Sequence, residues 1–180
     1  MTWIIIIVVA ALIIGPVMYV LPSAKDKRLM ALRAAAREAG LEVKLSYIVK
    51  LDAAADERVT SGGVAKLPSL PCVAYRLAHQ IPALQNIAEH QLLRIPTAPT
   101  LRYSEVFSQW ASIKTDQIGW WQQAGDFWTR WLKNLPDEVI AVQIDGRYLA
   151  CYWRESGQVE DGVIEAISTQ LRNCHLHFSS

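Results

Sequence analysis

The stretch from residue 138 to residue 153, EVIAVQIDGRYLACYW, is the clearest fold signal in the chain. Two runs rich in β-branched and aromatic residues flank Asp145-Gly146, a dipeptide typical of two-residue hairpin turns because both turn positions need a positive φ. A turn at these two residues predicts that Ile144 pairs with Arg147 and that Val142 pairs with Leu149. We therefore expect an antiparallel hairpin at the centre of a sheet.

The two faces of this hairpin differ in chemistry. One face is expected to form the core, which makes Cys151 a small buried hydrophobe rather than a nucleophile. Its apolar members are Ile140, Val142, Ile144, Leu149, Cys151 and Trp153. The other face, with Val139, Gln143, Tyr148 and Tyr152, is only partly polar. We expect a second layer to cover it, and the tryptophan-rich segment upstream is a candidate.

That upstream segment, residues 119–136, reads GWWQQAGDFWTRWLKNLP. Helical spacing places Trp121, Trp128 and Trp131 on one face, and Trp120 widens the apolar stripe. Two interpretations stay open. The aromatic side chains form the core of a domain, or some of them lie exposed in a membrane interface or a partner's groove. On the second interpretation the candidate interaction residues are Trp120, Trp121, Trp128 and Trp131.

Downstream of the hairpin, residues 158–173 carry an apolar stripe at helical spacing, with acidic residues near the start and Arg172 near the end. This pattern predicts an amphipathic helix lying on the sheet. The tail that follows holds Cys174, His175 and His177, the one cluster of metal-ligating residue types. In an extended tail both histidines would project to the same side. The alternative is a frayed terminus with no ligand, and no metal or cofactor is assigned.

Upstream of the tryptophans the pattern is weaker. Residues 41–51, LEVKLSYIVKL, alternate as a half-buried strand does, and a short strand from Cys72 is expected to pair with it. Residues 52–71 are rich in Gly, Pro and small residues and predict a long loop. A brief helix is expected at residues 83–93, followed by loop through residue 119. The predicted fold class is α+β, with an antiparallel sheet of about four strands packed by helices.

The N-terminus carries a different signal. Residues 3–21, WIIIIVVAALIIGPVMYVL, contain no charge and nearly reach the length that crosses a bilayer. They predict a retained transmembrane anchor over residues 1–22, followed by a basic juxtamembrane helix over 23–40 with Ser23 as N-cap and Gly40 after its end. The α+β domain is then residues 41–180. The basic membrane-surface residues are Lys25, Lys27, Arg28, Arg33 and Arg37.

Because basic residues near a span stay in the cytoplasm, these residues predict a single-pass protein of the bacterial inner membrane with an outside N-terminus and a cytoplasmic domain. The expected partners are the lipid bilayer and a membrane protein or a second copy of the chain. Lys and Arg number 18 against 17 Asp and Glu, and no basic stripe occurs, so nucleic-acid binding is not expected. The three widely spaced cysteines predict no disulfide.

The order of anchor, proline, basic helix and the segment DERVTSGGVAK at residues 56–66 is similar to the small accessory subunit of the bacterial Sec preprotein translocase. The resemblance covers residues 3–66 and implies an accessory subunit of a membrane complex. As a whole, the chain looks like an N-terminally anchored bacterial inner-membrane protein.

No catalytic motif emerges, so the leading expectation is a non-catalytic interaction or scaffold module at the cytoplasmic face of the membrane. One alternative is a membrane-associated enzyme with a pocket between the sheet and the tryptophan-rich helix, lined by Tyr148, Tyr152 and nearby acids. Lipid binding through the basic helix is a further alternative.

Overall fold

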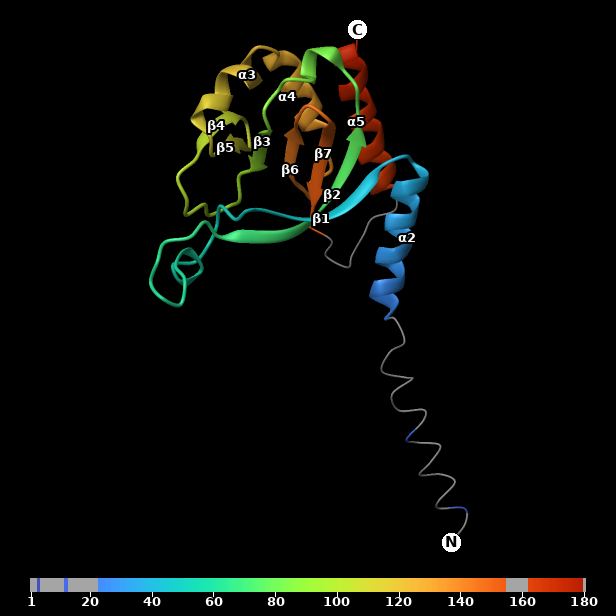
Figure 1. Cartoon of the computed structure of the whole chain (residues 1–180), viewed down its shortest axis with the longest axis vertical. Coiled ribbons are helices and arrows are strands. Elements are labelled where there is room, and N and C mark those ends of the chain that lie inside the picture. The colour runs from blue at the N-terminus through green and yellow to red at the C-terminus, as the bar shows by residue number, and fades with distance from the viewer. Residues whose placement is uncertain (1–2, 4–11, 13–22, 155–161, 180) are drawn as a thin grey trace.

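A computed structural model describes Trp3, Leu12, residues 23–154 and residues 162–179. In this part of the chain, seven antiparallel strands form one sheet in the order β1-β2-β7-β6-β3-β5-β4 (Figure 1). The strands are β1 (Glu42–Val49), β2 (Ser69–Ala78), β3 (His90–Arg94), β4 (Ser104–Phe107), β5 (Trp110–Ser112), β6 (Val139–Ile144) and β7 (Tyr148–Trp153). The α-helices are α2 (Ala24–Glu38), α3 (Ile118–Gln122), α4 (Gly125–Lys133) and α5 (Val163–Ser179).

The predicted sheet of about four strands is wrong, because the described residues form seven. The helix expected at residues 83–93 is a single 3-10 turn, η2 (Pro82–Leu84), followed by β3. In β3 both Leu92 and Leu93 are buried, one on each face of the sheet. A strand that is buried on both faces lacks the alternation by which sequence patterns reveal strands. The loop expected through residue 119 instead contains the short strands β4 and β5.

The hairpin of β6 and β7 forms, with a register that differs from the predicted one. Ile144 pairs with Leu149 rather than with Arg147, so the turn is centred on Gly146 and Arg147. Asp145 Oδ1 accepts hydrogen bonds from the backbone amides of Arg147 at 2.7 Å and Tyr148 at 2.8 Å, which fixes the turn at this position. A shift of two residues leaves the side chains from Ala141 to Trp153 on their predicted faces.

Residue 146 must be glycine because the backbone of Gln85 leaves no room for a side chain, and not because the turn needs a positive φ there. It does not adopt the left-handed conformation, and a Cβ at this position would lie 2.5 Å from the carbonyl oxygen of Gln85. At the far end of β6 a bulge between Val139 and Ala141 turns Val139 into the core, opposite Trp153, in place of the expected Ile140.

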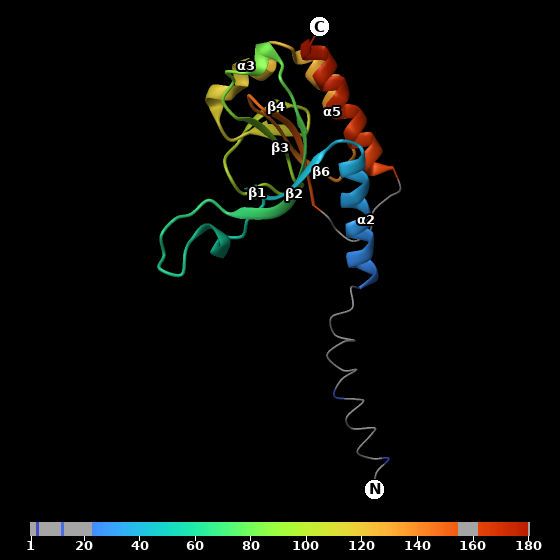
Figure 2. The ribbon, with the colours of Figure 1, turned by 45° about the vertical axis from the view of Figure 1, so that its right-hand side comes forward.

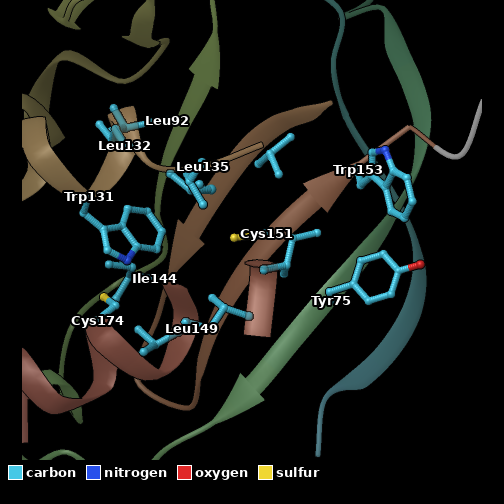
Figure 3. Close-up of a cluster of buried hydrophobic side chains, with 14 of the residues drawn as sticks. Tyr75, Leu92, Trp131, Leu132, Leu135, Ile144, Leu149, Cys151, Trp153 and Cys174 are labelled. Atoms are coloured by element: carbon cyan, nitrogen blue, oxygen red, sulfur yellow. The ribbon is translucent and has the colours of Figure 1, made fainter. Parts of the chain in front are cut away.

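Helices cover one face of the sheet (Figures 1 and 2). The core between them holds Cys151, which is fully buried near Leu135, Leu149 and Trp153, as Figure 3 shows. Trp131 joins α4 to α5, because its Nε1 donates a hydrogen bond to the Gln170 carbonyl at 2.7 Å. The predicted core face of the hairpin is therefore confirmed except at Ile140, and the expected burial of Cys151 is confirmed.

The basic helix forms as α2. Ser23 caps it: its hydroxyl accepts from the Asp26 amide at 3.2 Å, and the Asp26 carboxylate accepts from the Ser23 amide at 3.0 Å. The Ser23 hydroxyl also donates to the Asp26 carboxylate at 2.7 Å, and this bond lowers the pKa of Asp26. Gly40 follows the helix with a φ of 80°. Ala36 is fully buried, and α2 packs on α5 and β1, so this helix belongs to the folded domain.

Among the helices that the structure describes, none combines the length and the apolar composition needed to cross a bilayer. The longest, α5, has 17 residues and carries polar side chains along its length. The predicted span over residues 3–21 lies outside the described residues, apart from Trp3 and Leu12. This finding corrects the expectations of a single transmembrane helix and of a single-pass inner-membrane location.

Candidate functional site: a groove on the uncovered sheet face

The face of the sheet that the helices leave uncovered is hollowed into an open groove of about 1010 Å³, here called the sheet groove. Ala74 on β2 lines the groove, and Ala141 on β6 and Ala150 on β7 lie on the same face of the sheet outside that lining. Residues from β1, β2, β3, β6 and β7 and from the segments before β3 and after β5 line the groove.

The other end of the same face is closed by a second apolar cluster. Leu101 and Tyr103 pack there against the residues on the strands. Thr100 ties this segment to the loop after β1: its amide donates to the Leu51 carbonyl at 2.7 Å and its hydroxyl donates to the Ala53 carbonyl at 2.7 Å. The groove is therefore the part of the face that these loops do not cover.

The middle of the groove carries a chain of polar side chains. The Tyr152 hydroxyl donates to Gln143 Oε1, and Gln143 Nε2 donates to Asp145 Oδ2 at 3.2 Å. The same Asp145 carboxylate holds the hairpin turn through its other oxygen. The turn thus positions Gln143, and Gln143 positions the Tyr152 hydroxyl.

Tyr152, which lines the groove, and Cys72, which is buried on the same face of the sheet, have raised pKa values. Burial, with a smaller contribution from the Glu89 carboxylate, raises the pKa of Tyr152 to about 12. Burial also raises the pKa of the Cys72 thiol to about 11. Both groups are therefore neutral near pH 7, where they donate hydrogen bonds rather than act as base or nucleophile.

Arg76 is the best-held cation of the groove. Its guanidinium lies 4.2 Å from the centroid of the Tyr148 ring and forms an ion pair with Glu42 at the start of β1. The side chain is 17% exposed. Arg76 is thus fixed in place at the wall of the groove between β1 and β7.

The opposite wall is built by Gln117, which is buried although it is polar. Its Nε2 donates to the Glu89 carbonyl at 2.6 Å, and its Oε1 accepts from the Gln91 amide at 3.3 Å. These two bonds fix the segment before β3 against η3 (Thr115–Gln117). Beside them, Ser112 accepts from the Lys114 amide at 3.2 Å and donates to its carbonyl at 2.9 Å, which holds Lys114 at the rim.

The charged side chains that line the groove are more basic than acidic. They are Lys44, Arg76, Lys114, Arg147, Glu89 and Asp145, four cations and two anions, for a formal excess of two positive charges. The formal net charge of the whole chain is +1, so the rest of the chain is slightly acidic and the positive charge is concentrated at the groove. Such a lining attracts an anionic ligand.

The structure separates the four predicted interaction tryptophans. Trp121 and Trp128 are fully buried and Trp131 is 5% exposed, all in the core beneath α3 and α4, while Trp120 is partly buried. The rings of Trp121 and Trp128 meet edge to face, with centroids 4.9 Å apart. Three of the four therefore face the core rather than a surface, as the first of the two interpretations expected.

The C-terminal tail is helical rather than extended. Because α5 continues to Ser179, His175 and His177 lie about 200° apart around it and Cys174 enters the core. Burial raises the pKa of the Cys174 thiol. His177 stacks on Phe127, with ring centroids 3.8 Å apart. Among the described residues, no group of three or more His, Cys, Asp or Glu side chains is placed to hold a metal ion.

The five predicted membrane-surface residues lie along α2. Arg33 is partly buried and the other four are exposed: Lys25, Lys27, Arg28 and Arg37. None of these five residues lines the sheet groove. The first basic residue after α2 that lines it is Lys44.

Sequence patterns placed Gln143, Tyr148 and Tyr152 on one face of the hairpin, and the structure confirms that they share the groove. Patterns missed Arg76, Gln91 and Lys114, which come from three other segments. A signal for Arg76 exists in β2, where small or polar Cys72, Ala74 and Arg76 alternate with larger apolar residues. Such an alternation marks a strand with one face in the core and the other at an open hollow.

No family model matches the chain, and neither a curated protein nor a solved structure matches it. The resemblance of residues 3–66 to the Sec accessory subunit therefore stays a prediction.

Proposed function

We propose that this protein is a non-catalytic interaction module and that the sheet groove binds an acidic peptide segment of a partner protein. The observation that carries the proposal is the lining of the groove: polar donors and acceptors beside an apolar floor that includes Ile48, Ala74 and Leu93, with an excess of basic over acidic side chains.

The volume of the groove suits a short peptide. Small-molecule sites enclose about 300–1,000 Å³, and this groove, at about 1010 Å³, is at the upper end of that range, with room for several residues of an extended segment. Gln91 and Gln143 each offer an amide that can donate and accept, as the peptide groups of an extended segment require. Lys44, Lys114 and Arg147 lie exposed at the rim, where they can meet carboxylates.

The chemistry of the groove favours binding over catalysis. Burial raises the pKa of Tyr152, and the Asp145 carboxylate accepts hydrogen bonds from the backbone of the hairpin turn. The enzymatic alternative placed a pocket between the sheet and the tryptophan-rich helix. Tyr148 and Tyr152 do line the groove, but none of its described lining residues comes from α3 or α4.

The test is a fluorescence anisotropy titration of the full chain with two pools of labelled decapeptides, one with Asp and Glu at half of its positions and one with Lys and Arg there. The acidic pool is expected to bind more tightly, with an affinity that falls as salt rises. The double variant Lys114→Glu/Arg147→Glu should weaken that binding at least about tenfold, because it reverses two rim charges.

The matched control is Arg130→Glu/Lys133→Glu, which makes the same charge change at exposed positions of α4 outside the groove. It should leave the affinity for the acidic pool within about twofold, less than 0.5 kcal/mol. Equal binding of both pools, or equal losses in the two double variants, would refute the proposal.

A further inference from the structure

The outer edge of β1 is an open sheet edge. β1 stands at the end of the strand order, and β2 is its one strand partner among the described residues. The Lys50 amide donates to the Pro68 carbonyl at 3.0 Å, so Lys50 and every second residue before it have backbone groups that point toward β2. Antiparallel pairs alternate between hydrogen-bonded and non-hydrogen-bonded. The backbone groups of Val43, Leu45, Tyr47 and Val49 therefore point away from β2.

The same edge exposes two large apolar side chains. Leu45 is 70% exposed and Tyr47 is 71% exposed, although both belong to an eight-residue strand of regular pairing. Alternation puts them on one face, two residues apart. Unpaired backbone groups beside exposed apolar side chains make a template for another strand.

We propose that β1 pairs with β1 of a second copy of this chain, antiparallel, with Leu45 opposite Tyr47 of the second copy. This register joins the outward backbone groups of both strands. It also places Glu42 opposite Lys50 of the second copy, an attractive pair that occurs twice by symmetry.

Charge distinguishes this register from its neighbours. Pairing Tyr47 with itself would set Lys44 against Lys50, and pairing Leu45 with Val43 would set Lys44 against itself. Pairing Leu45 with itself would leave Glu42 opposite Ile48 and form no charge pair. Like charges directly opposite each other are destabilising. Of these four registers, the chosen one is the only one that joins opposite charges and avoids facing lysines.

The pairing also links the charge networks of the two copies. Within one chain, Glu42 holds Arg76, and Lys50 Nζ lies 2.7 Å from Glu57 Oε2. The two-fold axis would pass between the two Ser46 residues, perpendicular to the sheet. Both sheet grooves would then open on the same face, with their β1 walls adjacent, and the dimer would present two binding sites side by side.

The test is disulfide crosslinking of the full chain in a Cys72→Ala background, because Cys72 lies opposite Ser46 on β2. Ser46→Cys is expected to form a crosslinked dimer on mild oxidation, since the Cα atoms of a non-hydrogen-bonded pair lie about 4.5 Å apart, within disulfide range. Leu45→Cys and Tyr47→Cys report the neighbouring registers. Stronger crosslinking of either one than of Ser46→Cys would overturn the proposal.

Light scattering across a concentration series gives a second readout. Leu45→Lys is expected to raise the dimer dissociation constant at least about tenfold, because it removes apolar contacts on both sides of the axis. Leu176→Lys is the control, since Leu176 is 65% exposed on α5 and far from the β1 edge in sequence. A chain that is monomeric throughout, or an equal effect of both variants, would overturn the proposal. A dimer whose dissociation constant is unchanged by Leu45→Lys associates through another surface, and this result would also overturn the proposal.

Discussion

Replacing Gly146 by alanine tests how the hairpin turn is built. A Cβ at residue 146 would lie 2.5 Å from the Gln85 carbonyl oxygen, whereas ordinary contacts begin near 3.4 Å. The backbone must therefore separate by about 0.9 Å, and the neighbours Ile81 and Leu84 are buried and resist that movement. Forcing an extra methyl group into a packed site costs about 1–3 kcal/mol of unfolding free energy.

The measurement is urea unfolding of Gly146→Ala against the parent chain, followed by tryptophan fluorescence. Gly119→Ala is the matched control: Gly119 lies in α3, and its Cβ would meet no atom within 4 Å. Alanine there should stabilise the protein by up to about 1 kcal/mol, because glycine costs conformational entropy in a helix. If both variants shift stability in the same direction, the close approach of the turn to Gln85 is wrong.

Three further predictions concern the core and the groove. Trp128→Ala should destabilise the domain by about 3–5 kcal/mol in denaturant titrations, since Trp128 is fully buried, while Trp120→Ala should cost less; equal losses would contradict the assigned core. The folded-state pKa of Tyr152, about 12, exceeds its ordinary value of 10.0, so the native state holds the proton more tightly, and stability should fall as pH rises from about 10 to 12. Tyr152→Phe should flatten that fall, and an unchanged pH profile would contradict the burial of its hydroxyl. The three cysteines should react with a thiol reagent at pH 8 far more slowly in the native protein than in guanidinium, and fast native labelling would contradict their burial.

Local patterns predicted the elements whose two faces differ. Ser23, the stripe of α2 and Gly40 mark a helix that the structure confirms, and β1 and β2 pair as expected. The buried stripe of α5 includes Ile164, Ile167 and Leu171, as its spacing predicted. In each case the signal is local, since capping and amphipathic spacing involve residues within a few positions of one another.

The elements that patterns missed depend on distant contacts. Leu92 and Leu93 are consecutive and both buried, which no single face explains, and β5 has only three residues. Sequence spacing also gave no reason for α5 to continue past Asn173, because the helix end depends on Cys174 and Phe178 packing in the core. The alternation of β1 also did not predict that Leu45 and Tyr47 are exposed, which they are because they lie on the edge strand of the sheet.

The candidate site illustrates the same limit. Tyr152 and Gln143 are adjacent in the hairpin, so their shared face could be predicted. Arg76, Gln117 and Lys114 join them only because β2, β3 and β5 stand in one curved sheet, and that strand order is a property of the tertiary fold.

The most direct test of the groove as a binding surface is site-specific photocrosslinking to the acidic peptide pool. Benzoylphenylalanine replaces Ile113, which is 37% exposed at the rim of the groove, or Leu176, which is 65% exposed on α5. The account predicts that peptide is captured from position 113 and not from position 176, and that Lys114→Glu/Arg147→Glu abolishes the capture. Equal capture from both positions, or none from position 113, would contradict the claim that the sheet groove binds the partner.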